Sequence, residues 1–387
     1  MEVKVLKHKK IILILVLLLI ISSSSTFLIT HLNSKKPSVV NSASSSATKP
    51  EVPSPTPTPE PVPVKKDVLT EVTVTSVGDC TLGNDDKFSY NTLPSVLKKN
   101  NNDLSYFFKN VKDIFSADDI TVANLETTLT TSNNKLKKSG NVFYNFKGDP
   151  SYAKALTLGS IEAVNLSNNH IYDYENQGFQ DTMASLKNEN VNYFGEGNKY
   201  ITTIKDIKFA FLGYAAFGDS TEFRNKLKND IAEAKQQNCI VIINFHWGIE
   251  GQYTHTEGQT SLAHYAIDNG ADLIIGHHPH VIEGIERYKD KFICYSLSNF
   301  CFGGNNNPPD KDTFIFQIKY KFTNNILNSY GVRIIPCSIS SVTNVNDYCP
   351  TPLKDDRKLQ VLNKIIKLSP NLNINLSDDF SYINVNN

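Results

Sequence analysis

The chain has 387 residues, of which 39 are basic and 39 acidic, so its formal net charge is zero. This balance gives no support to a nucleic-acid-binding protein, because no bulk positive field exists to neutralise phosphates. The length allows one large domain or two small ones with a sizeable core. The six cysteines form no Cys-x-x-Cys pair and several lie in apolar runs. We therefore expect no dense disulfide framework, while a single bridge stays open.

The N-terminal segment predicts export from the cytoplasm. Four early lysines precede the apolar run 11–21, and the uncharged stretch continues to residue 33. The apolar run has the length of a signal peptide, whereas the whole uncharged span is long enough to cross a bilayer. The lysines favour a cytoplasmic N-terminus. We expect residues 1–33 to be an uncleaved, single-pass anchor in the cell membrane with the rest extracytoplasmic. A cleaved signal peptide is the alternative.

Residues 34–68 are rich in Ser, Pro and Thr and lack the aromatic residues needed for a core, which predicts a disordered, extended linker. A folded domain is expected over residues 69–322. Residues 323–387 are expected to form a C-terminal extension that packs on this domain and ends in a polar tail.

Strand and helix patterns alternate along the folded part. A β-rich run begins near Leu69 and leads into a Gly-Asp turn. Six short apolar strands that end in polar residues follow, at 119–126, 161–170, 207–217, 239–248, 271–280 and 291–300. Helices are predicted at 179–190 and 260–270, a strand pair near 330–340, and a last helix at 355–368. This alternation indicates the α/β class.

Polar residues gather where the predicted strands end. In open α/β sheets, ligands bind beyond the C-terminal ends of the strands. Each residue has an ordinary explanation as a turn, cap or packed side chain, but ligand-capable groups after five strands together indicate one site. In chain order they are Asp79, then Asn124 and Glu126, then Asn168, Asn169, His170 and Asp173, then His246, and finally His277, His278 and His280.

The residue types predict a divalent-metal site. Imidazole, carboxylate and amide oxygen suit Mn²⁺, Fe²⁺ or Zn²⁺, and the scarcity of thiolates excludes a structural zinc finger. If the segment around Pro279 is extended, His278 and His280 point the same way and reach one metal cluster. The remaining groups could hold a second ion, and two ions about 3.5–4 Å apart can activate a water. One or two ions are therefore expected.

A long series of motifs occurs in order over roughly residues 71–304. The motifs are SVGDCTLG, VANLETTLT, YNFKGDP, NLSNNHIYDY, GFQDTMASL, INFHWGIE, LAHYAIDNGADLIIGHHPHVIEGIE and YSLSNFCFGG. This series resembles the CapA family of capsule or poly-γ-glutamate biosynthesis proteins. The resemblance implies a four-layer αββα sandwich like that of calcineurin-type metallophosphoesterases.

Carried over residue by residue, the resemblance implies a set of metal ligands, namely Asp79, Glu126, Asn169, His170, His246, His278 and His280. His170 and His277 are the candidate catalytic residues, although His277 could also be a supporting donor or simply pack. Asn124, Asn168 and Asp173 are expected to support the ligands, because a ligating imidazole usually donates its other N–H to an acceptor.

The sequence also departs from the family patterns at several positions. The phosphoesterase motif Asp-x-His has Thr81 in place of its histidine, and Glu126 stands where a bridging aspartate is usual. These two changes leave room for altered or single-metal occupancy. Gly251, Glu175 and Ser298 are further departures, and none of them removes a candidate ligand.

Three functions are compatible with this pattern. The first is an anchored accessory protein that works beside membrane capsule-polymer synthase subunits on an anionic polymer, poly-γ-glutamate by resemblance. The second is a stand-alone metal-dependent phosphoesterase that hydrolyses a cell-envelope substrate, with His170 or His277 protonating the leaving group. The third is a binding domain that kept the fold and lost the chemistry. Whether the protein is an enzyme stays open.

Overall fold

The computed structural model describes residues 66–140, 143–370, 372 and 374–385. The predicted membrane anchor and nearly all of the predicted linker lie outside these residues. Among the helices of the described residues, none combines the length and the apolar character that a membrane span requires. All six cysteines lie within the described ranges, where they are buried and free.

The first sheet is built around β1 (Leu69–Thr81), the β-rich run expected at the start of the folded part. The strand order is β16-β15-β14-β1-β2-β5-β6, with β13 paired to β1 and β17 to β15. Strands β1, β2, β5 and β6 pair in parallel, whereas β14 and β15 are antiparallel. The other strands are β2 (Ile120–Leu125), β5 (Ala163–Asn165), β6 (Asn192–Phe194), β13 (Asn299–Phe302), β14 (Asp312–Thr323), β15 (Ile326–Ser338), β16 (Thr351–Pro352) and β17 (Ser381–Asn384).

The second sheet has the order β11-β12-β10-β9-β8-β7. Strands β8, β9, β10 and β12 run in parallel, so their C-terminal ends share one edge. Its strands are β7 (Tyr200–Ile204), β8 (Ile207–Ala215), β9 (Ile240–His246), β10 (Leu273–His277), β11 (Ile285–Tyr288) and β12 (Lys291–Cys294). The short strands β3 (Thr128–Leu129) and β4 (Lys147–Gly148) pair separately.

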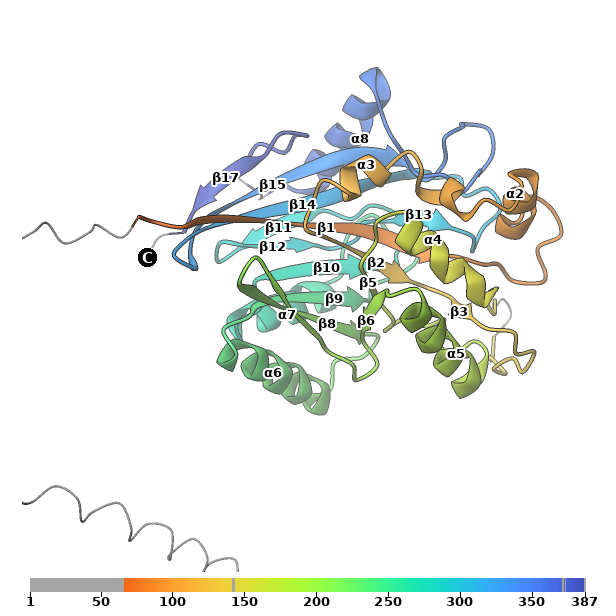
Figure 1. Ribbon diagram of the computed structural model, residues 1–387, viewed down its shortest axis with the longest axis horizontal. Coiled ribbons are helices and arrows are strands. Elements are labelled where there is room, and N and C mark those ends of the chain that lie inside the picture. The colour runs from red at the N-terminus through yellow and green to blue at the C-terminus, as the bar shows by residue number, and fades with distance from the viewer. Residues whose placement is uncertain (1–65, 141–142, 371, 373, 386–387) are drawn as a thin grey trace, which may run out of the picture. The chain divides into compact units, whose positions relative to one another are not determined.

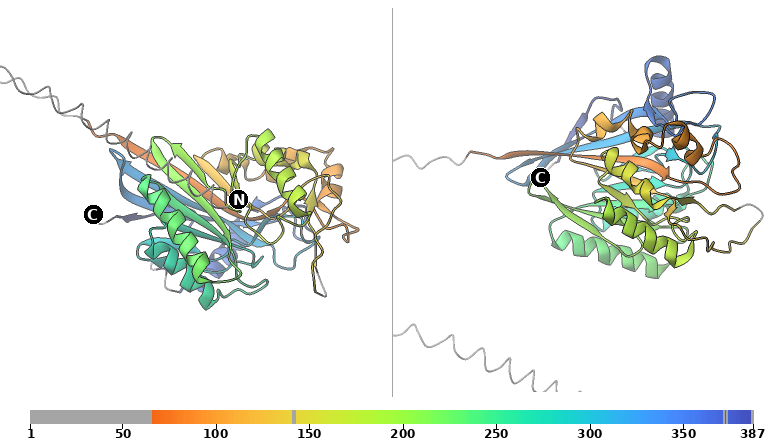
Figure 2. Two further views of the ribbon diagram at one scale, coloured as in Figure 1. Left: turned by 90° about the horizontal axis from the view of Figure 1, so that it is seen from below. Right: turned by 45° about the vertical axis from the view of Figure 1, so that its right-hand side comes forward.

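Three apolar clusters define the layers. One lies between the two sheets and joins residues such as Val74 of β1 and Ile242 of β9. The second packs the outer face of the first sheet against α2 (Leu93–Lys99), α4 (Ala153–Leu158) and α5 (Glu175–Asn188). The third packs the second sheet against α6 (Thr221–Gln236) and α7 (Glu257–Asp268). Helices therefore cover both outer faces of a pair of stacked sheets (Figures 1 and 2), and the predicted α/β class is confirmed.

Helices α2, α6 and α7 begin after residues whose side chains cap them. Helix α7 starts at Glu257, three residues before the predicted start, because Thr256 and Gln259 form a capping box. Helix α6 begins after Ser220, whose side chain accepts from Phe223 N. The helices are α2 (Leu93–Lys99), α3 (Lys112–Phe115), α4 (Ala153–Leu158), α5 (Glu175–Asn188), α6 (Thr221–Gln236), α7 (Glu257–Asp268) and α8 (Asp355–Leu368), with 3₁₀ turns at Leu104–Phe108 and Pro150–Tyr152.

The C-terminal segment continues the first sheet. Residues 316–323 of β14 pair with residues 69–76 of β1, and β15 folds back on β14. Helix α8, which spans the predicted residues, adds Val361 and Ile365 to the apolar cluster between the sheets. The chain after residue 322 is thus joined to the folded part by strand pairing as well as by packing.

Glu283 is a buried carboxylate that should make the stability of the fold depend on pH. Burial raises its pKa from 4.5 to about 7, although a hydrogen bond from Gln259 opposes this, and one carboxylate oxygen has no partner among the described residues. A raised acid pKa gives a stabilising contribution that is complete below about pH 4.5 and is lost as the pH rises through 7. Glu283→Gln should therefore stabilise the protein at pH 8 by about 2 to 3 kcal/mol relative to its effect at pH 4.5.

Urea unfolding of the wild type and of Glu283→Gln at both pH values measures this difference. The comparison between the two proteins is essential, because Asp118, whose pKa burial also raises to about 7, titrates in the same range in both. If the free energy of unfolding changes with pH equally in the two proteins, the Glu283 carboxyl does not cause the pH dependence of stability.

Candidate metal centre

Two neighbouring strands of the first sheet bring two carboxylates together. Asp79 lies near the C-terminal end of β1, and Glu126 directly follows β2. Parallel pairing sets Asp79 opposite Asn124, whose Nδ2 donates to Asp79 Oδ1 at 2.8 Å. Both carboxylates are fully buried. The strand pairing thus fixes two negative groups at one sheet edge without exposing them to bulk water.

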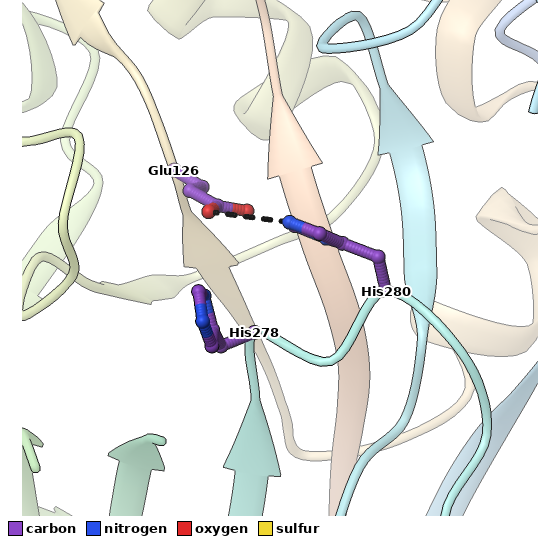
Figure 3. A group of neighbouring side chains, drawn as sticks. All are labelled: Glu126, His278 and His280. Atoms are coloured by element: carbon purple, nitrogen blue, oxygen red, sulfur yellow. Dashed lines mark ion pairs between the residues drawn. The ribbon is translucent and has the colours of Figure 1, made fainter. Parts of the chain in front are cut away.

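The second sheet supplies the histidines. His246 ends β9 and lies in register with His277 at the end of β10, and His278 and His280 follow in the next turn. Glu126 Oε1 lies 3.5 Å from His246 Nε2 and 3.8 Å from His280 Nε2. The carboxylate from one sheet therefore meets the imidazoles from the other, as Figure 3 shows for Glu126 and His280.

Glu126, His278 and His280 form a group that we call the metal group. One ligand atom from each lies within 4.8 Å of the other two. Both oxygens of Glu126 and Nδ1 of His278 are buried without a hydrogen-bond partner among the described residues. A buried carboxylate left unpartnered destabilises a fold by several kcal/mol unless a cation compensates its charge. The donor set and its unpaired atoms therefore fit a divalent ion.

The pKa shifts indicate which groups of the metal group a bound ion would have to deprotonate. Burial raises the pKa of Glu126 well above its usual value, and Asp79 adds to this against the opposing charge of His280. Burial and the neighbouring His280 lower the pKa of His278 to about 4, so its imidazole is neutral at pH 7 with a lone pair free. Burial would lower the pKa of His280 too, but Glu126 and Asp79 outweigh it and raise the value to about 9. Metal binding must therefore displace a proton from His280.

Asp79 is held as a carboxylate by its surroundings. Burial alone would raise its pKa, but contacts from His277 and His280 bring the pKa well below the usual value. Its Oδ2 accepts from the backbone N–H of His278 at 3.1 Å and lies 3.3 Å from His280 Nδ1. Asp79 therefore orients the turn that carries both histidines of the metal group.

His246 is joined to the first sheet by two amides. Its Nε2 lies 2.7 Å from Asn169 Oδ1, and its Nδ1 lies 3.2 Å from Asn124 Nδ2. Burial and the nearby His278 lower the pKa of His246 well below its usual value, so the ring is neutral. The structure thus brings the predicted ligands Asn169 and His246 to the Glu126 side of the centre.

His170 forms a pair with Asp173 at the border of the centre. His170 Nδ1 lies 2.6 Å from Asp173 Oδ2, and His170 Nε2 lies 4.0 Å from Glu126 Oε1. The Asn168 side chain accepts a hydrogen bond from the His170 backbone N–H and donates one to Leu125 O. These two hydrogen bonds hold the His170 loop against the end of β2. Two of the three predicted supporting residues thus contact His170, Asp173 through the ring and Asn168 through the backbone.

His277 lies between Asn244 and Asp79. It is fully buried, its Nε2 lies 3.0 Å from Asn244 Oδ1, and its Nδ1 lies 3.4 Å from Asp79 Oδ1. This position suits a residue that holds Asp79. Its catalytic role stays a prediction.

The turn from His278 to His280 corrects one expectation. The two residues have φ of 97° and 58°, so the segment is not extended and side-chain alternation does not explain their convergence. Instead, a left-handed turn that is unusual for residues other than glycine directs both rings toward Glu126, with ring centroids 5.7 Å apart. Such strain is typical of functional sites.

Three supporting residues escaped the sequence reasoning. Asn165 donates to Asn124 Oδ1 at 2.9 Å, and Asn299 Oδ1 lies 2.9 Å from His280 Nδ1. Lys138 pairs with Asp173 Oδ1 at 2.5 Å. Both asparagines stand at strand ends in quoted motifs, which was a usable signal, whereas Lys138 lies in a lysine-rich loop with no pattern.

Thr81 occupies the place of the missing histidine. Its hydroxyl donates to the backbone oxygen of Glu126 at 3.2 Å, so this side chain joins β1 to the residue after β2. The end of β1 therefore contributes Asp79 but no histidine to the centre.

Comparisons with known proteins point to capsule synthesis. A family model described as "Bacterial capsule synthesis protein PGA_cap" matches residues 73–304. The chain is 28% identical over 255 residues to "Capsule biosynthesis protein CapA" of Bacillus anthracis, a match that covers 60% of each chain. It is 32% identical over 215 residues to "PGA biosynthesis protein CapA" of Bacillus subtilis strain 168, which covers 50% of this chain and 56% of the relative. The matches thus span about three fifths of these relatives.

One solved structure resembles the fold distantly. The purple acid phosphatase PPD1 from yellow lupin seeds aligns with a TM-score of 0.32 at 9% identity, covering 75% of this chain and 55% of that one.

Proposed function

The chain belongs to the bacterial capsule synthesis protein PGA_cap family, and from this premise we propose that it is a membrane-anchored, extracytoplasmic accessory protein in the synthesis or export of an anionic capsule polymer, poly-γ-glutamate. One observation supports a chemical role for the protein in this function. The buried carboxylate of Glu126 has no hydrogen-bond partner among the described residues and lies next to His278 and His280. The proposed partners are the membrane synthase subunits that make the polymer. The N-terminal segment is proposed to hold the folded part near them.

The proposed cofactor is a divalent ion, Mn²⁺, Fe²⁺ or Zn²⁺. The metal group, Glu126, His278 and His280, would hold the ion. Asp79, Asn169 and His246 are the neighbouring candidate ligands. When bound, such an ion polarises oxygen atoms and lowers the pKa of water. Because Thr81 replaces a histidine donor, we expect one ion to bind more tightly than any second.

A stand-alone phosphoesterase is the second candidate, and the His170–Asp173 pair favours it. Asp173 holds the His170 ring from the Nδ1 side at 2.6 Å, which leaves Nε2 directed toward the centre. An imidazole held in this way can transfer a proton to a leaving oxygen. Under this second proposal, the protein shares the chemistry of metallophosphoesterases, as the family resemblance implies.

His278→Ala tests the proposed function in cells and in vitro. The variant should lose bound Mn, Fe or Zn, because it removes a neutral imidazole from the metal group, and cells that carry it should lose most of their capsule polymer. Elemental analysis of the purified chain and polymer measurement in cells check both results.

A phosphodiester assay of the same proteins separates the two candidates. Turnover by the wild type that disappears in His278→Ala would favour the phosphoesterase. Unchanged capsule in cells with His278→Ala would contradict a metal-dependent role in capsule synthesis. His264→Ala is the matched control, because this half-buried histidine pairs with Glu286 and is not part of the metal group.

A further inference from the structure

Two adjacent residues at the start of β13, Ser298 and Asn299, hold the turn that carries His280. Ser298 Oγ donates to His280 O at 3.1 Å, and Asn299 Nδ2 donates to the same oxygen at 3.2 Å. Asn299 Oδ1 lies 2.9 Å from His280 Nδ1. The pair therefore contacts both the backbone and the imidazole ring of this candidate ligand.

These contacts decide which ring nitrogen of His280 carries a proton. A backbone oxygen only accepts hydrogen bonds, so the amide nitrogen of Asn299 faces His280 O and its Oδ1 faces the ring. Because an amide oxygen also only accepts, His280 Nδ1 must be the donor of this hydrogen bond. Asp79 Oδ2, 3.3 Å from the same Nδ1, is a second acceptor. The other nitrogen, Nε2, lies 3.8 Å from Glu126 Oε1 on the side of the metal group.

Ser298 has a backbone conformation that favours glycine. Its φ is 67°, and its side chain is buried. Its carbonyl accepts from Asp79 N at 3.0 Å and lies 2.0 Å from the place where Gly78 would carry a Cβ, so β1 packs directly on this residue. A glycine would adopt this φ without strain but would lack the hydroxyl that donates to His280 O. The serine therefore joins the end of β1 to the His280 turn.

The ring of His278 has no acceptor of this kind. Its backbone N–H donates to Asp79 Oδ2 at 3.1 Å, but its Nδ1 is buried without a hydrogen-bond partner in the part of the chain that the structure describes. The ring packs against Phe217 instead, with centroids 4.8 Å apart. The two histidines of the metal group therefore differ, because hydrogen bonds hold the ring of His280 whereas packing holds the ring of His278.

We propose that Asn299 is a positioning residue that directs His280 Nε2 to the metal ion, and that Ser298 holds the His280 backbone in the conformation that this requires. The proposal rests on the candidate metal centre but not on the reaction that the ion serves. Asn299 also leaves Asp79 available as a ligand, because Nδ1 keeps an acceptor when Asp79 Oδ2 turns to an ion. An acceptor behind a ligating imidazole fixes the ring and makes the ligating nitrogen more basic.

Zinc titration of the full-length, detergent-solubilised protein tests the role of Asn299. Asn299→Leu removes the acceptor and should weaken zinc binding at least ~10-fold. Asn299→Asp keeps an oxygen at the same place, so its affinity should stay within about 3-fold of the wild-type value or rise. Ser298→Ala keeps the backbone strain but loses the hydroxyl, and should weaken binding about 3-fold. Asn192→Leu, at an exposed position of β6, is the matched control and should leave the affinity unchanged.

NMR of the ring nitrogens in zinc-loaded protein labelled with ¹⁵N-histidine gives a direct readout. The His280 signals, identified by their absence from His280→Gln, should show a proton on Nδ1 and zinc on Nε2, both in the wild type and in Asn299→Asp. Zinc on Nδ1 of His280 in the wild type would overturn the proposal even if every variant folds poorly.

The remaining outcomes keep this proposal apart from the proposed function. Wild-type zinc affinity in Asn299→Leu, or an affinity in Asn299→Asp that falls as far as in Asn299→Leu, would overturn the positioning role and leave the metal centre standing. A wild type that binds neither zinc nor manganese would overturn the metal centre itself, and the positioning role with it.

Discussion

Glu126→Gln should abolish stabilisation of the protein by divalent metal. In the wild type, saturating Mn²⁺ at 100 times its dissociation constant should stabilise the fold by about 2.7 kcal/mol. The glutamine side chain has nearly the same shape but provides no negative charge to the ion, so we expect the metal affinity to fall at least ~100-fold, in the range seen when ligand environments are disrupted. Thermal unfolding with and without Mn²⁺ measures this loss.

The same variant should make the metal-free protein more stable above neutral pH. Burial raises the pKa of Glu126 well above its usual value, so ionising this carboxyl in the folded protein opposes folding as the pH rises. Glutamine does not ionise and removes this effect. Glu283→Gln is the matched control for the Mn²⁺ measurement, because this variant also neutralises a buried carboxyl but lies outside the metal group. Equal stabilisation by Mn²⁺ in the wild type and in Glu126→Gln would contradict the assignment of Glu126 as a ligand.

Gly276→Ala should destabilise the fold by about 3 kcal/mol or more, because a well-packed interior has no room for the added methyl group. The new Cβ would lie 1.9 Å from Tyr295 O and 2.6 Å from Trp247 Nε1, and these two atoms are themselves hydrogen-bonded at 2.9 Å. Strand β10 would have to move away from this neighbour, and the turn with His278 would move with it. We therefore expect metal affinity to fall together with stability, as measured by urea unfolding and metal titration.

Gly218→Ala is the control for this glycine. A Cβ at Gly218 would meet no atom within 4 Å, and its φ lies outside the left-handed range. We expect its effect on the free energy of unfolding to stay within about 0.5 kcal/mol. Wild-type stability in Gly276→Ala would show that the close approach of β10 to Tyr295 is not needed.

The positions of the candidate ligands at strand ends were predictable from local patterns, and their metal binding stays a prediction. Each candidate ligand follows an apolar run, and parallel strands carry their C-terminal ends to a shared edge. The pairing of β1 with β2 and of β9 with β10 places the candidate ligands within each sheet, and the packing of the two sheets brings Glu126 and His278 together. Local patterns do not specify this packing.

The long-range pairing was not predictable in the same way. Strand β1 pairs along most of its length with β14, more than 240 residues later, and local propensity does not identify such a partner. Helix α6 was also missed, because its long polar stretch has few apolar residues at helical spacing, and three buried residues anchor it, Leu227, Ile231 and Ala234. Both the pairing of β1 with β14 and the formation of helix α6 therefore depend on tertiary packing.

The conformation of the turn from His278 to His280 also differs from the one that the sequence predicts. The His-x-His spacing suggested an extended segment, yet both histidines adopt a positive φ. The hydrogen bond from the His278 backbone to Asp79 and the contact of His280 with Asn299 hold this turn. Both partners come from distant strands, so sequence spacing alone could not predict the turn.

Anomalous X-ray diffraction from crystals grown with Mn²⁺ tests the central claim most directly. Data collected on both sides of the manganese absorption edge should show a peak within coordination distance of Glu126, His278 and His280, and this peak should vanish in Glu126→Gln crystals. A fully occupied manganese peak elsewhere, with none between these three side chains, would contradict the account.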